Sequence, residues 1–313
     1  MDNFIFVATQ VGVLFSLMAV GVVCRKTRLL EEAAIKGIVN VLFLIVTPCL
    51  IVDCFQRPFD PASLRSLGLA FAIAILAHVA LIFFAVATIR NRSEDTRVVL
   101  RLAAVFSNAG FMGIPLEHAL FGSDGVFFGV VYVVVFNLMI WSWGLCVVKG
   151  VSLGTMRAKE TIPLFLNPGT VGILVALPLF VFSVRLPTVP AECVRMISSL
   201  NTPLAMIVIG YYLTGTALGA VVRFPGAYFA AFVRLVACPA ALLAAVVPFR
   251  GSIDRTMALA LVTAASAPVA AMVSIFASKY GRDVDMSVGI VSGTTLLSML
   301  TMPVVISVAM AVL

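Results

Sequence analysis

The chain has 313 residues, of which 62% are hydrophobic and 11% are charged. An average soluble domain is ~45–50% apolar and ~25% charged, so we expect lipid to cover most of the surface of this protein. The composition excludes nucleic-acid-binding proteins, secreted disulfide scaffolds and soluble enzymes, and it leaves the net charge of +7 to be explained by topology.

Ten apolar segments follow one another along the chain: residues 4–23, 35–55, 66–89, 98–121, 126–148, 164–183, 195–219, 224–248, 256–277 and 285–312. Each approaches the ~20 residues that a helix needs to cross a bilayer. The first segment ends in a basic run instead of a small-residue cleavage site, which predicts a membrane span and not a signal peptide. We therefore predict an all-α integral membrane protein with ten transmembrane helices.

The distribution of lysine and arginine predicts the orientation of these helices. Fourteen of the 21 residues lie in or beside the links that follow odd-numbered segments, six lie on the opposite side, and Arg234 falls inside a segment. Because positively charged loops favour the cytoplasm, we expect both termini to lie outside the cytoplasm.

Three pairs of positions suggest two related halves, residues 1–150 and 151–313. The members of each pair lie 153 to 156 residues apart: Thr47-Pro48 with Thr202-Pro203, Pro115 with Pro268, and His78 with Arg234. Since each half holds five segments, an odd number, the second half would be inverted relative to the first, as in many secondary transporters. The alternative is chance, because prolines are common in membrane helices.

The fourth and ninth segments contain residues that disfavour a continuous helix. The fourth holds an asparagine, two glycines and a proline within Asn108–Pro115, and the ninth holds the small-residue run Ala264–Ala271 with Pro268 inside it. Broken helices persist in lipid only where protein or water surrounds the freed backbone. We expect two half-helix N-termini to face a common point and bind a carboxylate or another anion. The alternative is a pair of kinked packing helices without a ligand.

Four stretches of the chain are similar to one family of membrane proteins. They are Asn108–Leu116, Asn167-Pro168, Ala267-Pro268 with the later Phe276–Tyr280, and Leu296–Pro303. They resemble the auxin efflux carriers, which include the plant PIN exporters, and the resemblance covers nearly the whole chain. It implies an inverted-repeat fold similar to that of the bile-acid symporters, with segments 1, 2, 6 and 7 as a scaffold and segments 3–5 and 8–10 as a moving transport domain.

The resemblance also implies that the broken fourth and ninth helices cross at the substrate site and that transport is elevator-like. Family substrates are organic anions: auxin in plants, and carboxylates such as malonate or malate proposed in bacteria. The link over residues 149–161 is short, as in bacterial members, which argues against auxin itself. We expect a homodimer in a bacterial cytoplasmic (inner) membrane, with lipid and a small organic anion as its partners.

The expected substrate-binding residues gather around the two breaks: Asn108, Ala109, Gly110, Gly113, Pro115, Asn137, Ser266, Ala267 and Pro268. Asn108 could hydrogen-bond a carboxylate or cap the broken helix. Asn137 lies in the middle of a segment, where an unpaired amide is costly, so we favour a place in the site over a contact between two helices.

Four ionisable residues at membrane depth are candidates for coupling or for attracting the anion. Arg234 could attract the anion or extend to the membrane interface, and His78 could carry a proton or pack as a neutral histidine. Glu117 and His118 follow Pro115 and could couple protons to transport or form a polar rim of the cavity. The coupling ion, H+ or Na+, stays open.

The sequence lacks the residues of an enzyme or of a metal site. Its six cysteines are scattered and its two histidines form no cluster with them. It also has no zinc-protease, nucleophile-elbow or phosphate-loop motif. We therefore expect no cofactor and no nucleic-acid partner, and we predict a secondary transporter of a small organic anion. The alternative is an anion channel or membrane sensor that uses the same crossing helices without alternating access.

Overall fold

The computed structural model describes residues 2–91, 93–151, 168–214 and 224–313. Within these ranges the chain is helical and has no β-strand, and seven helices are long and apolar enough to cross a membrane. The prediction of an all-α membrane protein is thus confirmed. Parts of the sixth and seventh predicted segments, including Asn167, lie outside the described residues.

The helices are, in chain order, α1 (Asp2–Lys26), α2 (Glu32–Val41), η1 (Leu42–Val46), α3 (Thr47–Phe55), α4 (Pro61–Thr88), α5 (Glu94–Val105), η2 (Ala109–Gly113), α6 (Ile114–Met139), η3 (Ile140–Gly144), α7 (Leu145–Lys149), α9 (Pro168–Val181), α10 (Thr188–Ser198), α11 (Asn201–Leu213), α13 (Pro225–Phe232), η5 (Val233–Ala237), α14 (Cys238–Val246), η6 (Val247–Phe249), α15 (Arg255–Ser266), α16 (Met272–Lys279) and α17 (Val284–Val312).

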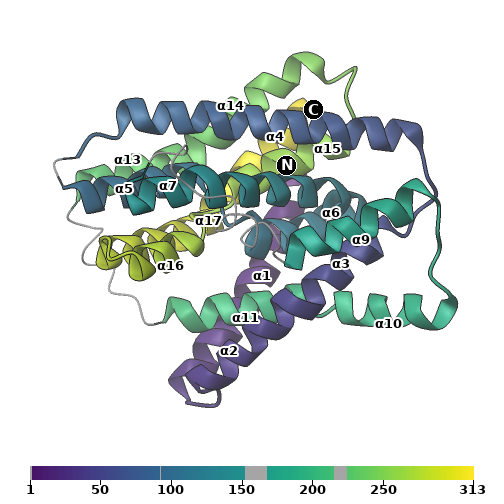
Figure 1. Cartoon of the computed structure of the whole chain (residues 1–313), viewed down its shortest axis with the longest axis horizontal. Coiled ribbons are helices and arrows are strands. Elements are labelled where there is room, and N and C mark those ends of the chain that lie inside the picture. The colour runs from purple at the N-terminus through teal and green to yellow at the C-terminus, as the bar shows by residue number, and fades with distance from the viewer. Residues whose placement is uncertain (1, 92, 152–167, 215–223) are drawn as a thin grey trace.

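Two helix pairs pack with their backbones in close contact. Gly210 of α11 faces the Met18 carbonyl of α1, and Gly21 faces the Ile207 carbonyl, so that neither glycine leaves room for a Cβ. Gly172 of α9 likewise lies against Pro48 of α3. Small residues allow this close approach, which is how helices associate in lipid. Figure 1 shows α1 crossing α11, with α2 and α3 forming one long rod beside them.

A wide π-helical turn precedes each of three prolines inside the long apolar helices. The turns η1, η2 and η5 each end two residues before a proline: Pro48, Pro115 and Pro239. A proline lacks the N–H of a normal helical bond, and its ring clashes with the carbonyl one turn back. Widening the preceding turn moves that carbonyl away, so the helix continues through the proline.

Two helices stop among buried residues and resume after a few residues. The chain leaves the helical conformation over residues 106–108, between α5 and η2, and again over residues 267–271, between α15 and α16. We call these two stretches the crossover. A further break follows at Gly122, whose φ of 63° and ψ of −150° divide α6 into two helices. A residue with a side chain rarely adopts this conformation, so glycine sets the turn between the fourth and fifth predicted segments.

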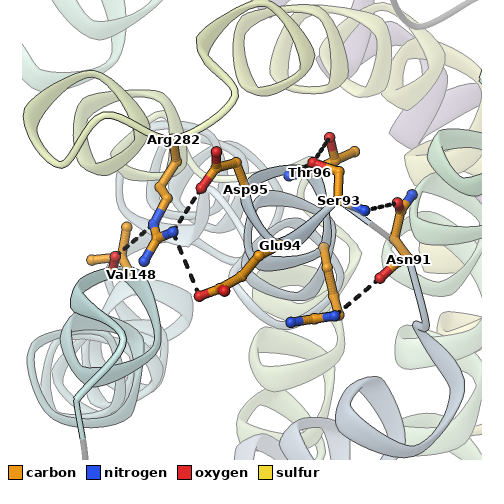
Figure 2. A network of polar contacts seen from close by, with 8 residues as sticks. Asn91, Ser93, Glu94, Asp95, Thr96, Val148 and Arg282 are labelled. Atoms are coloured by element: carbon orange, nitrogen blue, oxygen red, sulfur yellow. Dashed lines mark hydrogen bonds and ion pairs between the residues drawn. The ribbon is translucent and has the colours of Figure 1, made fainter.

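A polar network ties together helix ends at one side of the molecule (Figure 2). The Arg282 guanidinium donates to the Asp95 carboxylate at 2.6 Å and to the Val148 carbonyl at 2.8 Å. Thr96 of α5 donates to Asp283 at 2.7 Å, and Asp283 in turn caps α17. The start of α5, the end of α7 and the segment between α16 and α17 are therefore held as one unit.

Candidate functional site

The two broken helices meet backbone to backbone at the crossover. The Asn108 N–H donates to the Pro268 carbonyl at 2.6 Å, and the Ala270 N–H donates to the Phe106 carbonyl at 2.9 Å. These two bonds form an antiparallel bridge between Ser107 and Val269. The pairing satisfies backbone groups that each break would otherwise leave unbonded in an apolar environment. The fourth and ninth predicted segments are thus joined at their interruptions.

A single buried cation, Arg234 of η5, binds the ends of both interrupted helices. Its side chain is fully buried. One Nη donates to the Val105 carbonyl at 2.7 Å, at the end of α5. The other donates to the Ala265 carbonyl at 2.5 Å, near the end of α15, and to the Cys238 sulfur at 2.9 Å. The Arg234 side chain therefore points into the protein, where backbone carbonyls accept its hydrogen bonds.

This contact changes the electrostatics of the crossover. The C-terminal end of a helix carries about half a negative charge, and a cation there is favourable. Arg234 thus offsets the negative ends of α5 and α15. The N-terminal ends of η2 and α16 point to the same region and keep their positive character.

The N-terminal end of η2 offers unpaired hydrogen-bond donors. The N–H groups of Ala109, Gly110 and Phe111 have no acceptor among the described residues, as expected for the first turn of a helix. Gly110 is exposed, and a Cβ built on it would meet only the Val133 side chain, at 3.9 Å. The space beside these donors is open.

The Asn108 side chain does not cap the helix that follows it. Its backbone carbonyl accepts from the Met112 and Gly113 N–H groups at 2.9 and 3.3 Å, but its side-chain amide makes no cap and no other hydrogen bond to the described residues. Of the two roles open to Asn108, ligand contact is therefore the one that the local geometry leaves available.

A small cavity lies beside the crossover and holds about 40 Å³, room for two or three water molecules. Gly110, Ile114 and Asn137 line one side, and residues of α3, α9 and α11 line the other. Two of these, Thr47 and Asn201, are polar and were absent from the residues predicted for the site. Thr47 belongs to the matched stretch Thr47-Pro48, whereas Asn201 only precedes its counterpart, Thr202-Pro203.

The remaining predicted residues of the crossover serve its packing. Ala109, Gly113, Pro115 and Ala267 are buried, and the Pro268 carbonyl is occupied by Asn108. The Ser266 hydroxyl donates to the Thr263 carbonyl of its own helix at 2.8 Å. The backbone of the second break is further held by Thr294 of α17, whose hydroxyl accepts from the Val269 N–H at 3.2 Å.

His78 is buried on the other side of the first break. Its Nδ1 lies 2.8 Å from the Ala74 carbonyl, and its ring packs against Tyr132 at 4.8 Å between centroids. The Nε2 atom has no partner among the described residues. His78 is not among the residues that line the cavity.

Glu117 and His118 do not face one common space. Glu117 is fully buried, and neither carboxyl oxygen has a hydrogen-bond partner within the described residues. His118 is exposed. Adjacent residues on a helix point ~100° apart, so burial of one and exposure of the other follows from the helix itself.

The comparison with known proteins agrees with this architecture. The sequence profile of a family described as membrane transport proteins matches residues 6–161 and 152–306. No curated protein matches the chain. The two matched ranges together cover most of the sequence, so the chain belongs to this family of membrane transport proteins, the auxin efflux carrier family.

Proposed function

We propose that the protein is a secondary transporter that moves a small organic anion across the membrane by an elevator-type alternating-access mechanism. The observation that carries this proposal is the charge balance at the crossover. Arg234 offsets both helix C-termini there, while the N–H groups that open η2 stay unbonded beside a cavity. A fixed set of positive helix ends without a carboxylate partner favours an anionic ligand.

The lining of the cavity suits a carboxylate. The Gly110 backbone and the Asn137 and Asn201 side-chain amides supply donors, and a carboxylate accepts such bonds strongly. The cavity is too small for a dicarboxylate as it stands. In the proposed cycle its two walls separate to admit the anion, and close again before the site opens to the opposite side.

The two walls belong to the two units that the proposal sets in motion. The scaffold comprises α1, α3, α9 and α11, in which α1 packs on α11 and α3 packs on α9. The transport domain comprises the helices around the crossover and includes the network centred on Arg282 (Figure 2). A cavity between such units can change its access when one unit slides past the other.

Inverted repeats are part of the same proposal. α5 and α15 each have 12 residues and both end at the crossover. The packing of α1 on α11 would correspond to the packing of α9 on α3 when the halves are exchanged. These correspondences support ten spans in two inverted halves. The proposal also includes both termini outside the cytoplasm, a bacterial inner membrane and a homodimer.

Counterflow in proteoliposomes tests this function. Vesicles containing the purified protein are loaded with unlabelled malonate, malate, indole-acetic acid or another small carboxylate, and labelled acid is added outside. A carrier gives a transient overshoot of label that requires the internal acid. Uptake that ignores the internal acid would support the channel alternative, and no saturable uptake or binding of any acid would remove the anion-transport proposal.

A further inference from the structure

Glu117 is the one carboxylate in the described part of the chain that is fully buried with both oxygens unbonded. Its carboxyl group presses against the backbone of Gly129, where even a Cβ would overlap with Oε2. Oε1 lies 3.7 Å from the position of a Cβ on Gly113. The carboxyl group thus fills a space made by glycines between the first and second parts of α6, close to the start of the half-helix that follows the crossover.

The charged groups around this space do not pair with Glu117. On α6, Asp124 pairs with Arg57 at 2.7 Å, and His118 is exposed. The residue Ala264 of α15 lies beside Gly113, but the charged residue of α15, Arg255, donates to the Met310 carbonyl near the far end of that helix.

Two further titratable groups stand on neighbouring helices. On α3, the Cys54 thiol lies within electrostatic range of Glu117. On α4, His78 bonds the Ala74 carbonyl through Nδ1. Neither one hydrogen-bonds the Glu117 carboxyl group.

An ionised carboxylate in this position would be unstable. A buried charge without a counter-charge or hydrogen bonds costs far more than a buried neutral acid. Glu117 therefore holds a proton while it is enclosed. When water reaches it, hydration stabilises the carboxylate. Enclosure and access to water thus favour opposite protonation states of the same group.

We propose that Glu117 binds the proton that is transported together with the organic anion. This inference rests on the proposed function. The carboxylate takes one proton from water on one side, carries it as a neutral acid through the closed conformation, and returns it to water on the other side. An anion at the start of η2 would be repelled by an ionised Glu117 less than three helical turns away. Protonation therefore favours anion binding, which makes the coupling a symport.

A proton fits this space better than a sodium ion. A hard cation requires several oxygen ligands around it, and neither Glu117 oxygen has a hydrogen-bond partner among the described residues. A proton needs only the carboxyl group itself. A sodium gradient that drives uptake in the following experiment would overturn this choice.

The experiment uses the full-length protein in proteoliposomes with malonate, or with the acid that gives the largest counterflow. Wild-type vesicles should accumulate the acid when the outside is made acidic relative to the inside. The Glu117→Gln variant should still exchange labelled for unlabelled acid but should lose accumulation driven by the pH gradient. Glu192→Gln, the same change at an exposed glutamate that pairs with Arg195, is the matched control and should keep this drive.

The results separate the two proposals. Absence of counterflow in the wild type contradicts the proposed function, whereas counterflow with pH-driven accumulation that persists in Glu117→Gln contradicts only the role of Glu117. If Glu117→Gln does not fold, wild-type protein in detergent provides the decisive measurement. Malonate should then bind more weakly as the pH is raised above neutral, because ionised Glu117 repels the anion, and an affinity independent of pH would refute the inference.

Discussion

Arg234 should be the residue on which the crossover depends most strongly. Replacing it with methionine removes the donors that bind the Val105 and Ala265 carbonyls at 2.7 and 2.5 Å. A buried carbonyl that loses its partner costs about 1–3 kcal/mol. Removing the guanidinium also removes the desolvation penalty of a buried charge, which offsets part of this cost. We therefore expect Arg234→Met to destabilise the fold by about 2–5 kcal/mol.

The assay is thermal unfolding in detergent combined with hydrogen exchange. For a chain of this size each kcal/mol lowers the melting temperature by about 1.5 °C, so Arg234→Met should melt roughly 3–8 °C lower. The amide protons of Asn108 and Ala270 should also exchange faster, and both should respond together because one side chain holds both helix ends. Arg234→Lys should lie in between, since an ammonium group lacks the planar fork that spans two acceptors.

The matched control is Arg255→Met. Arg255 is exposed and donates one hydrogen bond, of 2.9 Å, to the Met310 carbonyl. Surface changes of this kind usually alter stability by less than about 0.5 kcal/mol. If Arg234→Met melted within about 2 °C of the control, a difference of about 1 kcal/mol, or if only one of the two amides exchanged faster, a joint role of Arg234 in both helix ends would be refuted.

Three further substitutions test the site and the fold. Asn108→Ala should leave the melting temperature unchanged, because the Asn108 amide makes no hydrogen bond to the described residues. It should weaken binding of the transported acid, measured by isothermal titration, about tenfold or more through loss of a charge-assisted bond. Unaltered affinity would place the anion elsewhere. Gly122→Ala, at a φ of 63°, should cost about 1–2 kcal/mol in thermal unfolding, and no loss would mean that the turn relaxes. Gly210→Leu should separate α11 from the Met18 carbonyl of α1 and sharply reduce the yield of folded protein in size-exclusion chromatography; a wild-type elution profile would show that this contact is dispensable.

The sequence predicts helices and their interruptions well because these depend on local chemistry. The segments over residues 285–312 and 224–248 agree closely with helices at Val284–Val312 and Pro225–Phe249. The second break lies within the marked run of small residues, Ala264–Ala271. However, the first break falls at residues 106–108 and Pro115 stands inside a helix, because the wide turn η2 absorbs the missing donor.

The partners of polar side chains could not be predicted in the same way. Arg234 binds carbonyls of α5 and α15, about 130 and 31 residues away in the chain, and a backbone carbonyl leaves no mark in the sequence because every residue has one. Thr47 and Asn201 were missed for a related reason. Their place at the cavity depends on how α3 and α11 pack against the crossover, which local patterns do not specify.

The matched positions of His78 and Arg234 gain a physical reason from the structure. Both side chains are buried beside the crossover, but the three carbonyls at its helix ends are already occupied by one guanidinium. A second arginine would bring a like charge into the same apolar region with few acceptors left, which is strongly unfavourable. Histidine can remain neutral and needs only one acceptor, the Ala74 carbonyl. The charge of Arg234 therefore offsets the two negative helix ends, and the neutral His78 ring adds no further charge. In the proposed function, the positive N-terminal ends of the half-helices remain available to a substrate.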